Sequence, residues 1–415
     1  MGIISRLMER RSTPANPDAF ILNALGLGGP DTTAGVTVTP DVALTYGVVY
    51  ACVRIRAETI SSLPLPVYRR LQPRGKARAP DYPLYEVLHD IANPEMTAMT
   101  LREIMQGHLD TWGNGYAEIE RDKGGHVKAL WPLSPNKMRV ARENGQLMYW
   151  YGTNAGEVPL IPSRVLHIPG FGFDGLIGYS PIRLHREAIA GGLATQEYGN
   201  RFFANGARPG GILSHPKTLS EPAAQRLKSQ FEKDHGGLSQ SHRLKVLEEG
   251  MSYTAIGIPP EDAQFLETRK FQVTEIARIF RVPPHMLADL DRATFSNIEH
   301  QSIEFVVHTI RPWLVRWEQS INLRLLGPDE RGTYFAEHLV DGLLRGDIKS
   351  RYEAYAVGRQ NGWLSANDIR EFENLNPVDG GDIYLVNGNM MPVDQANKSD
   401  KGVFGKEGGA SGIGT

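Results

Sequence analysis

Residues 259–326 decide the fold, because they encode two long helices separated by a short polar segment. The first part starts at Pro259 and has the sequence PPEDAQFLETRKFQVTEIARIF. Its end is predicted near the pair Pro283-Pro284, since proline lacks an N–H and disfavours helix in the residue before it. Apolar residues recur mainly at helical spacing along this part, at Phe265, Leu266, Ile276, Ile279 and Phe280.

The second part follows the polar segment ADLDRATFSN, residues 288–297, and has the sequence IEHQSIEFVVHTIRPWLVRWEQSINLRLL. Ser296 or Asn297 can cap this helix, and Pro312 inside it predicts a kink. Two long helices hinged on a short polar loop suit a mechanical element rather than a catalytic one. The apolar positions of the second helix are Ile298, Ile303, Val306, Val307, Ile310, Leu314, Trp317, Ile321 and Leu325.

The composition is that of a soluble protein with room for two or more domains. The 415 residues are 41% hydrophobic and 22% charged, and no run approaches the ~20 apolar residues that span a membrane. The net charge is −2, whereas proteins that hold DNA by its phosphates are usually strongly basic, so any DNA contact should be loose or local. The single cysteine, Cys52, lies in an apolar helical run and is expected to be a buried structural thiol.

Residues 40–178 are expected to form one α+β domain, preceded by a mobile arm at 1–39. Thr100 is predicted to cap a helix, with Glu103 completing a capping box. Glycine turns then separate alternating segments that favour antiparallel strands. The first helix of the domain should bury the periodic residues Val49, Val53, Ala57 and Ile60.

Residues 180–206 predict a helix of about 25 residues that Ser180 and Pro181 begin. The pair Gly191-Gly192 inside it costs about 1 kcal/mol per residue. Local bending and close approach of another helix both explain these glycines.

A small β-α-β-β unit is predicted between the long helices, at 207–258. Ser220 should cap its helix, and its last two strands should form a hairpin around Glu249-Gly250. Beyond Leu326 the pattern predicts one short strand and then two helices, the second capped by Ser365.

These residues carry a resemblance to a known family. The string EDAQFLETRKFQVTEIARIFRVPPHML, followed by TFSNIEHQSIEFVVHTIRPWL, resembles the core signature of the HK97-type tailed-bacteriophage portal proteins. The resemblance continues upstream through YACVRIRAETISSLPLPVYRR, GYSPI and RFFANGARPGGIL, and covers roughly residues 40 to 390. One departure is Arg281, where many relatives have glycine.

The resemblance implies an α+β portal-like subunit whose parts map onto this sequence in order. It implies a mixed α/β wing, two long stem helices, an inserted small α/β clip, a tunnel loop, a long kinked helix and a helical C-terminal crown. The expected boundaries are 1–39 for the arm, 40–178 for the first part of the wing, 180–206 and 259–284 for the stem helices, 207–258 for the clip, 285–297 for the tunnel loop, 298–341 for the kinked helix and second part of the wing, 342–394 for the crown, and 395–415 for a disordered tail.

The resemblance also implies the function and the partners. A ring, typically of twelve subunits, would occupy one capsid vertex and form the channel through which double-stranded DNA is packaged and ejected. Its expected partners are copies of itself, double-stranded DNA, the large terminase subunit, the major capsid protein or scaffold, and head-completion or tail adaptor proteins. The expected location is the virion, with the host cytoplasm during assembly. Neither a cofactor nor an enzymatic activity is expected.

Three sets of residues are the candidate functional sites. The tunnel loop between the proline pair and the capped helix should line the narrowest part of the channel, although an ordinary buried connector would have the same sequence. The candidates are Asp289, Asp291, Arg292, Thr294 and Phe295 in the DNA-channel loop, Arg226, Lys228 and Lys233 in the motor-docking clip, and Trp313 and Trp317 in the oligomer-contact helix.

Two other functions compete with the portal interpretation. Asp289 and Asp291 with Glu261 and Asp262 could imitate the carboxylate metal site of a DNA-processing enzyme, although the proline break would have to return them to one point. The glycines of 170–175 match G-x-G-x-x-G, but no helix opens directly from them as a dinucleotide site requires. A simple glycine loop is the better interpretation.

Overall fold

The computed structural model describes residues 32–204, 211–216, 220–223, 225–226, 229, 251–255, 262–289, 295–340, 348–373 and 375–385. The chain divides into two compact units, residues 1–340 and 341–415. Both units contain helix, and the described strands lie in the first, so the chain is of the α+β class. The predictions for the arm up to 31, the Glu249-Gly250 hairpin and the tail lie outside the described residues.

The described helices are as follows. The α-helices are α3 (Pro40–Leu44), α4 (Gly47–Ser61), α5 (Pro83–His89), α6 (Ala98–Trp112), α7 (Pro181–Leu184), α8 (Arg186–Ala204), α10 (Asp262–Phe280), α11 (Phe295–Glu304), α12 (Arg311–Arg324), α13 (Ile348–Gln360) and α14 (Ala366–Phe372). A π-helical segment, η5, spans Phe305–Ile310, and 3-10 turns lie at η1 (Pro135–Lys137), η2 (Pro162–Arg164) and η4 (Pro284–Leu287).

The described strands form small sheets. Their order is β13-β1-β2, β10-β5-β6, β7-β8-β9, β3-β4 and β11-β12. The strands are β1 (Val67–Arg70), β2 (Lys76–Arg78), β3 (Ile91–Asn93), β4 (Met96–Thr97), β5 (Asn114–Arg121), β6 (Val127–Leu133), β7 (Met138–Glu143), β8 (Gln146–Thr153), β9 (Gly156–Leu160), β10 (Val165–Pro169), β11 (Gly211–Ser214), β12 (Ser252–Ala255) and β13 (Tyr334–Ala336).

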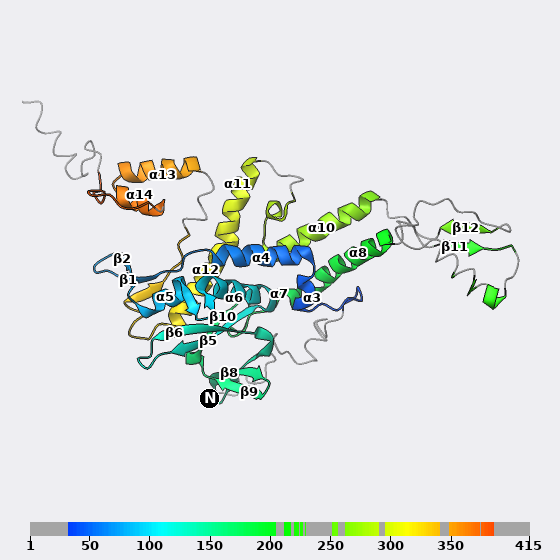
Figure 1. Ribbon diagram of the computed structural model, residues 1–415, viewed down its shortest axis with the longest axis horizontal. Coiled ribbons are helices and arrows are strands. Elements are labelled where there is room, and N and C mark those ends of the chain that lie inside the picture. Colours follow the sequence, from blue (N-terminus) through cyan, green and yellow to red (C-terminus); the bar gives the residue numbers. More distant parts are fainter. Residues whose placement is uncertain are drawn as a thin grey trace, which may run out of the picture. The chain divides into compact units, whose positions relative to one another are not determined.

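The body of the first unit is layered, with α4 on α6 and α6 on the β10-β5-β6 sheet (Figure 1). The predicted periodicity of α4 is confirmed, because Val49, Val53, Ala57 and Ile60 are all buried, as is Cys52. The predicted cap of α6 is wrong. Thr97 is the N-cap, and its side chain accepts a hydrogen bond from the Thr100 N–H, so Thr100 is already inside the helix.

The antiparallel strands predicted between 114 and 169 are confirmed, but they form two sheets rather than one meander. The turn η1 separates the two sheets along the chain, and β9 was not anticipated because four of its five residues are exposed. Apolar side chains from both sheets pack into a shared core. Its members are Tyr116, Leu133, Met138, Val140, Tyr149, Leu160, Val165 and Ile177.

A buried ion pair joins α4 to α6. Arg56 Nη2 lies 2.7 Å from Asp110 Oδ1, with side-chain exposures of 6% and 0%. Gln106 donates to the same carboxylate oxygen and accepts from the Trp317 indole N–H of α12 at 3.0 Å. The other carboxylate oxygen has no hydrogen-bond partner among the described residues. Burial accordingly raises the pKa of Asp110 to about 6, even though Arg56 and Gln106 act in the opposite direction.

We predict that Asp110→Asn lowers the free energy of unfolding by about 3–5 kcal/mol, because the Arg56 guanidinium is then buried without a counter-charge. Adding Arg56→Met should recover part of that loss. Chemical denaturation of both single variants and the double variant gives the coupling energy. If the losses in free energy of unfolding of the two single variants simply add in the double variant, the ion pair does not contribute to stability.

The long helix predicted at 180–206 is divided. Ser180 caps the four-residue α7 as expected, since its side chain accepts from the Arg183 N–H, but the chain then breaks at His185 before α8 begins. The adjacent glycines Gly191 and Gly192 of α8 differ in the space around them. A Cβ at Gly192 would lie 2.6 Å from Tyr46 Cε1, whereas one at Gly191 would meet only Gln272 Nε2 at 3.5 Å. Close approach therefore explains Gly192, and the neighbour is the Tyr46 ring.

We predict opposite effects of alanine at these neighbouring glycines. Gly192→Ala should destabilise the protein by about 1–3 kcal/mol, because the Tyr46 ring must move. Gly191→Ala has room for its methyl group and should be neutral or stabilising by up to about 1 kcal/mol, since alanine favours helix. Thermal denaturation of the two variants side by side tests this, and equal effects would argue against the Tyr46 contact.

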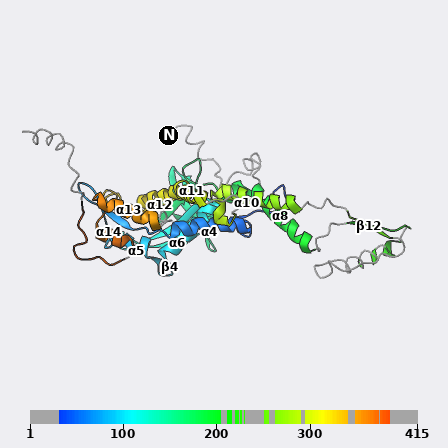
Figure 2. The same ribbon diagram turned by 90° about the horizontal axis from the view of Figure 1, so that it is seen from above.

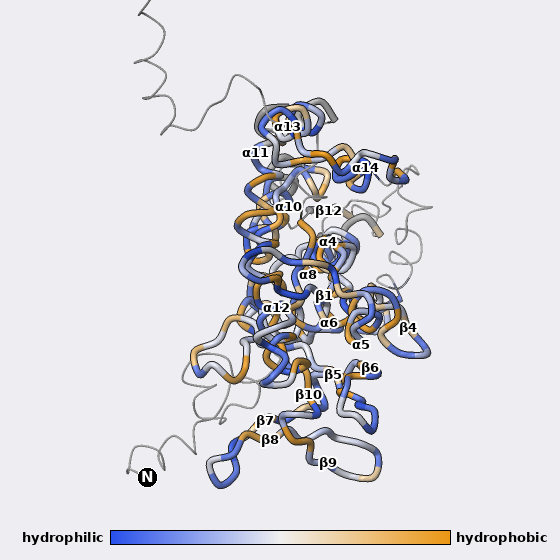
Figure 3. The backbone as a smooth tube through the Cα atoms, turned by 90° about the vertical axis from the view of Figure 1, so that its left-hand side faces the viewer, coloured by the Kyte–Doolittle hydropathy of each residue, from blue (hydrophilic) through white to orange (hydrophobic). Residues whose placement is uncertain are grey.

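Helices α8 and α10 pack side by side (Figure 2). The chain leaves α8 and re-enters α10 through the segment that contains the paired strands β11 and β12. In the second half of the unit, α11, η5 and α12 follow one another without a break, and the π-helical segment ends just before Pro312. Figure 3 shows apolar and polar residues alternating along these helices.

Two further features complete the fold. Strand β13 pairs with β1, with Val67 opposite Ala336, so the end of the first unit returns to its beginning. In the second unit, Ser365 caps α14 through a capping box with Asp368, and Tyr355 of α13 stacks on Phe372 of α14 at 6.0 Å.

Candidate functional site

The segment between α10 and α11 begins at a strained helix end. Arg281 follows the last residue of α10 with φ of 55°, in the left-handed region, and the Val282 N–H donates to the Ala277 carbonyl at 2.9 Å. The Thr309 hydroxyl of η5 donates to the Arg281 carbonyl at 2.9 Å. Glycine is favoured at such a position because it lacks a Cβ. The resemblance implies that many relatives have glycine at this position, and glycine would suit this backbone conformation.

We predict that Arg281→Gly stabilises the protein by about 0.5–1 kcal/mol. The left-handed conformation costs a non-glycine residue about 1–2 kcal/mol, which the greater freedom of glycine in the unfolded chain partly offsets. The Arg281 side chain is exposed, so little contact is lost. Denaturation midpoints check the sign. Arg278→Gly, inside α10, is the matched control and should destabilise.

Residues 284–289 are held against α11 by a histidine. The His285 ring lies in η4 with Nδ1 2.9 Å from Gln301 Oε1 and Nε2 3.4 Å from Ser302 Oγ. The Asp289 N–H donates to the Pro284 carbonyl at 3.1 Å, and Ala288 adopts φ of 61°. The start of the predicted tunnel loop is therefore a turn fixed at both ends, and residues 290–294 lie outside the described residues.

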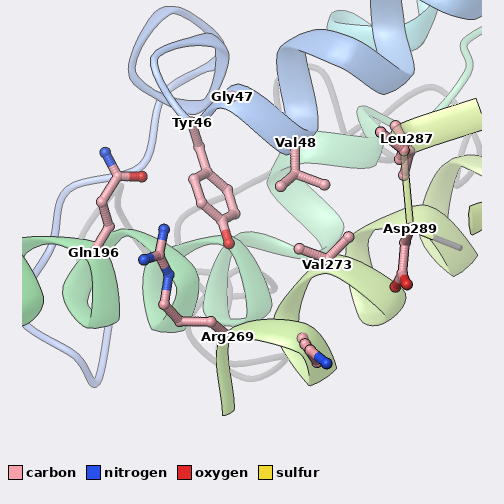
Figure 4. A pocket seen from close by; sticks show the side chains of 10 residues that line it. Tyr46, Gly47, Val48, Gln196, Arg269, Val273, Leu287 and Asp289 are labelled. Atoms are coloured by element: carbon pink, nitrogen blue, oxygen red, sulfur yellow. The ribbon is translucent and has the colours of Figure 1, made fainter. Parts of the chain in front are cut away.

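A cavity of about 540 Å³ lies between this turn, the beginning of α4 and helices α8 and α10 (Figure 4). The Tyr46 ring extends into it, and burial raises the pKa of its hydroxyl while Arg269 acts in the opposite direction. The cavity thus lies where the two long helices meet the base of the predicted tunnel loop. No pattern in the sequence predicted it. Its lining residues are Tyr46, Gly47, Val48, Gln196, Arg269, Lys270, Val273, Leu287, Ala288 and Asp289.

The predicted channel residues are only partly described. Asp289 is half-buried and lines the cavity. Phe295 is the first residue of α11, which places the predicted caps Ser296 and Asn297 inside the helix. Asp291, Arg292 and Thr294 lie outside the described residues.

The predicted clip residues are described at one position. Arg226 is exposed, and its Nε donates to the Pro222 carbonyl at 3.3 Å. Lys228 and Lys233 lie outside the described residues. At Ser220, the predicted cap of the clip helix, the backbone carbonyl accepts a hydrogen bond from the Ala223 N–H at 2.9 Å.

The two tryptophans of α12 differ in burial, and the prediction that Trp317 contacts a neighbouring subunit is corrected. Trp317 is 1% exposed and bonded to Gln106, so its ring belongs to the core of its own subunit and is not available to a neighbour. Trp313 is half-buried, with the guanidinium groups of Arg56 and Arg316 at 5.2 and 5.7 Å from its ring. The continuous helix formed by α11, η5 and α12 also has exposed apolar residues, of which only Ile303 and Val307 were among the apolar positions named from the sequence. They are Ile303, Val307, Val315 and Leu323.

The motifs for other chemistries gain no support. Within the described ranges, no group of three or more His, Cys, Asp or Glu side chains could hold a metal ion. Glu261 and Asp291 of the proposed carboxylate cluster lie outside those ranges. No described helix is long and apolar enough to cross a membrane.

The glycine motif at 170–175 forms a loop closed by Asn114. The Asn114 amide donates to the Gly178 carbonyl and accepts from the Gly178 N–H, both at 2.8 Å. His167 Nε2 also lies 3.1 Å from Asn114 Oδ1, and burial lowers the pKa of His167 to about 3, so this ring is neutral. Close backbone packing explains Gly170 and Gly172, where a Cβ would lie 2.7 Å from the Gly113 carbonyl oxygen and 2.1 Å from the Ile177 carbonyl oxygen, and a positive φ of 69° explains Gly175.

Comparison with known proteins confirms the resemblance seen in the sequence. The family model for phage portal proteins matches residues 47–374. The chain is 34% identical over 361 residues to the portal protein of Enterobacteria phage HK97, covering 86% of this chain and 85% of that one. It is 36% identical over 410 residues to the probable portal protein of Streptomyces phage phiC31, covering 94% and 86%.

A solved structure agrees at the level of the fold. A chain in the neck of a native GTA particle, computed with C12 symmetry, superposes with a TM-score of 0.55 at 22% identity, covering 86% of this chain and 99% of that one. The chain therefore belongs to the phage portal protein family, whose members are structural proteins of the virion.

Proposed function

We propose that this protein forms a ring at one vertex of the capsid, typically of twelve subunits, and that double-stranded DNA is packaged and ejected through its central channel. The observation that carries the proposal is the family match over residues 47–374, with relatives named as portal proteins matched over most of their length. The C12 symmetry of the neck structure supports the subunit number.

The subunit contact is assigned to the long helix. Ile303, Val307, Val315 and Leu323 are between 39% and 55% exposed along α11, η5 and α12. They leave an apolar surface that a neighbouring subunit would cover. Trp313 remains a candidate for this contact because its ring is half-buried.

The channel constriction is assigned to the loop that begins at residues 284–289. The described residues on the two sides of 290–294 are held by His285 and by α11, and the segment between them is the one proposed to meet DNA. The mixed charge of Asp289, Asp291 and Arg292 suits a conduit, because a strongly basic lining would bind phosphates and slow the sliding of DNA.

The remaining parts follow the order expected from the family. Helices α8 and α10 serve as the stem, and the segment between them, which includes Arg226, serves as the clip that contacts the large terminase subunit. The β-rich body serves as the wing, and α13 and α14 belong to the crown. Capsid or scaffold protein and head-completion or tail adaptors are the further partners, with assembly in the host cytoplasm.

The test is a cysteine at Ala293. Cys52 is buried, and burial raises its pKa to about 12, so the new thiol would be the reactive one. The purified protein should have the mass of a ring in light scattering. Ala293→Cys subunits should cross-link around the bore, and the linked rings should assemble but package DNA poorly. A monomeric mass at every concentration and salt would contradict the ring, and a thiol that neither cross-links nor reacts with a probe would contradict the channel loop.

A further inference from the structure

Among the described residues of the first unit, the two most exposed aromatic side chains belong to a cluster on the loop between β10 and α7. Phe171 is 64% exposed and Phe173 is 81% exposed. Their ring centroids are 5.5 Å apart, and the Tyr179 ring lies 5.2 Å from Phe173 and 6.5 Å from Phe171, all in edge-on arrangements. We call Phe171, Phe173 and Tyr179 the aromatic knob. The two phenylalanines are variable positions of the glycine motif, which the proposed function leaves unexplained.

The backbone beneath the aromatic knob is held by close packing. A Cβ at Gly178 would lie 2.1 Å from the Gly113 carbonyl oxygen, and one at Gly172 would lie 2.1 Å from the Ile177 carbonyl oxygen. The Tyr179 N–H donates to the Phe171 carbonyl at 2.7 Å. The loop is therefore tight and preorganised.

The loop is also fastened to the core. Ile177 is 3% exposed and belongs to the core between the sheets. Asp174 Oδ1 accepts from the Leu176 and Ile177 N–H groups at 2.8 and 2.9 Å, which directs this carboxylate into the backbone. A loop fixed to this degree exposes apolar rings at little further loss of conformational entropy on binding, as in preorganised interfaces.

The loop that carries the aromatic knob is hydrogen-bonded to α12. Helix α12 packs on β10, and Arg316 Nη1 donates to the Pro169 and Gly170 carbonyls at 3.2 and 3.1 Å, next to Phe171 in the chain. Val315, the residue before Arg316, is 39% exposed. The loop and the helix assigned to the subunit contact are thus tied together at the base of the knob.

We propose that the aromatic knob anchors the contact with a second copy of this chain, by inserting Phe171 and Phe173 into an apolar recess of the neighbour. This inference rests on the proposed ring. A ring closes through two different surfaces of each subunit, so a surface that projects on one side is covered by a different surface of the neighbour. Aromatic residues at the centre of an interface commonly supply most of its binding energy.

The first experiment compares ring assembly of two double variants. Phe171→Ser with Phe173→Ser should raise the subunit concentration at half-assembly about 30-fold or more, which corresponds to about 2 kcal/mol per contact. Val158→Ser with Ile161→Ser is the matched control, since these residues are 44% and 51% exposed on and after β9, and it should assemble like the wild type. Circular dichroism and the thermal midpoint of dissociated subunits should agree for all three proteins.

The second experiment identifies the occupant. Phe173→p-benzoylphenylalanine in assembled rings should give a ladder of cross-linked subunits on irradiation. If the wild type forms no ring, the proposed function and the knob contact both fail. If the wild type and the knob variant assemble at the same concentration, the knob contact fails while the ring stands. If irradiation of infected-cell assemblies links the knob to another protein instead, the assignment to a second copy is overturned.

Discussion

The buried contact between Arg56 and Asp110 is the constraint on which the body of the protein depends. It joins α4 to α6 directly, and Gln106 extends it to Trp317 of α12, so three helices far apart in the sequence share one polar network. Arg56 also donates to the Phe280 carbonyl at 3.3 Å and lies over the Phe280 and Trp313 rings. The last turn of α10 is thereby tied to the same point.

This network places the mechanical parts. The end of α10 is fixed to the body by the hydrogen bond from Arg56 to the Phe280 carbonyl. The Thr309 hydroxyl donates a second hydrogen bond to the next carbonyl, that of Arg281, where the chain turns toward residues 284–289. Apolar side chains alone would have filled the same volume, but they would not have fixed the direction of a helix end as hydrogen bonds do. The cost is a carboxylate that burial disfavours, which appears as the raised pKa of Asp110.

The sequence predicted the parts of the fold that depend on local pattern. The periodic residues of α4, the antiparallel strands and the caps at Ser180 and Ser365 follow from spacing and from side-chain chemistry, and the structure contains them. It did not predict the division of the strands into two sheets or the break at His185, because these depend on packing against distant elements.

Trp317 shows why the sequence could not predict the functional sites as well as the fold. A tryptophan on a long apolar helix has the same pattern whether it faces a neighbour or, as here, Gln106 of its own subunit. No sequence pattern could have predicted the cavity at Tyr46, since its lining residues come from four separate segments of the chain.

The pairing of β1 with β13 has a consequence for synthesis of the chain. Val67 is made early, but its partner Ala336 follows only after the long helices and everything between them. At translation rates of about 5–20 residues per second, the interval is on the order of tens of seconds. During that time one edge of β1 lacks its final partner, and an unpaired edge is a site for wrong pairing with other chains. The sheet that closes the body is thus also the last part of it that can form, so a chain released before residue 336 leaves the ribosome with an open strand.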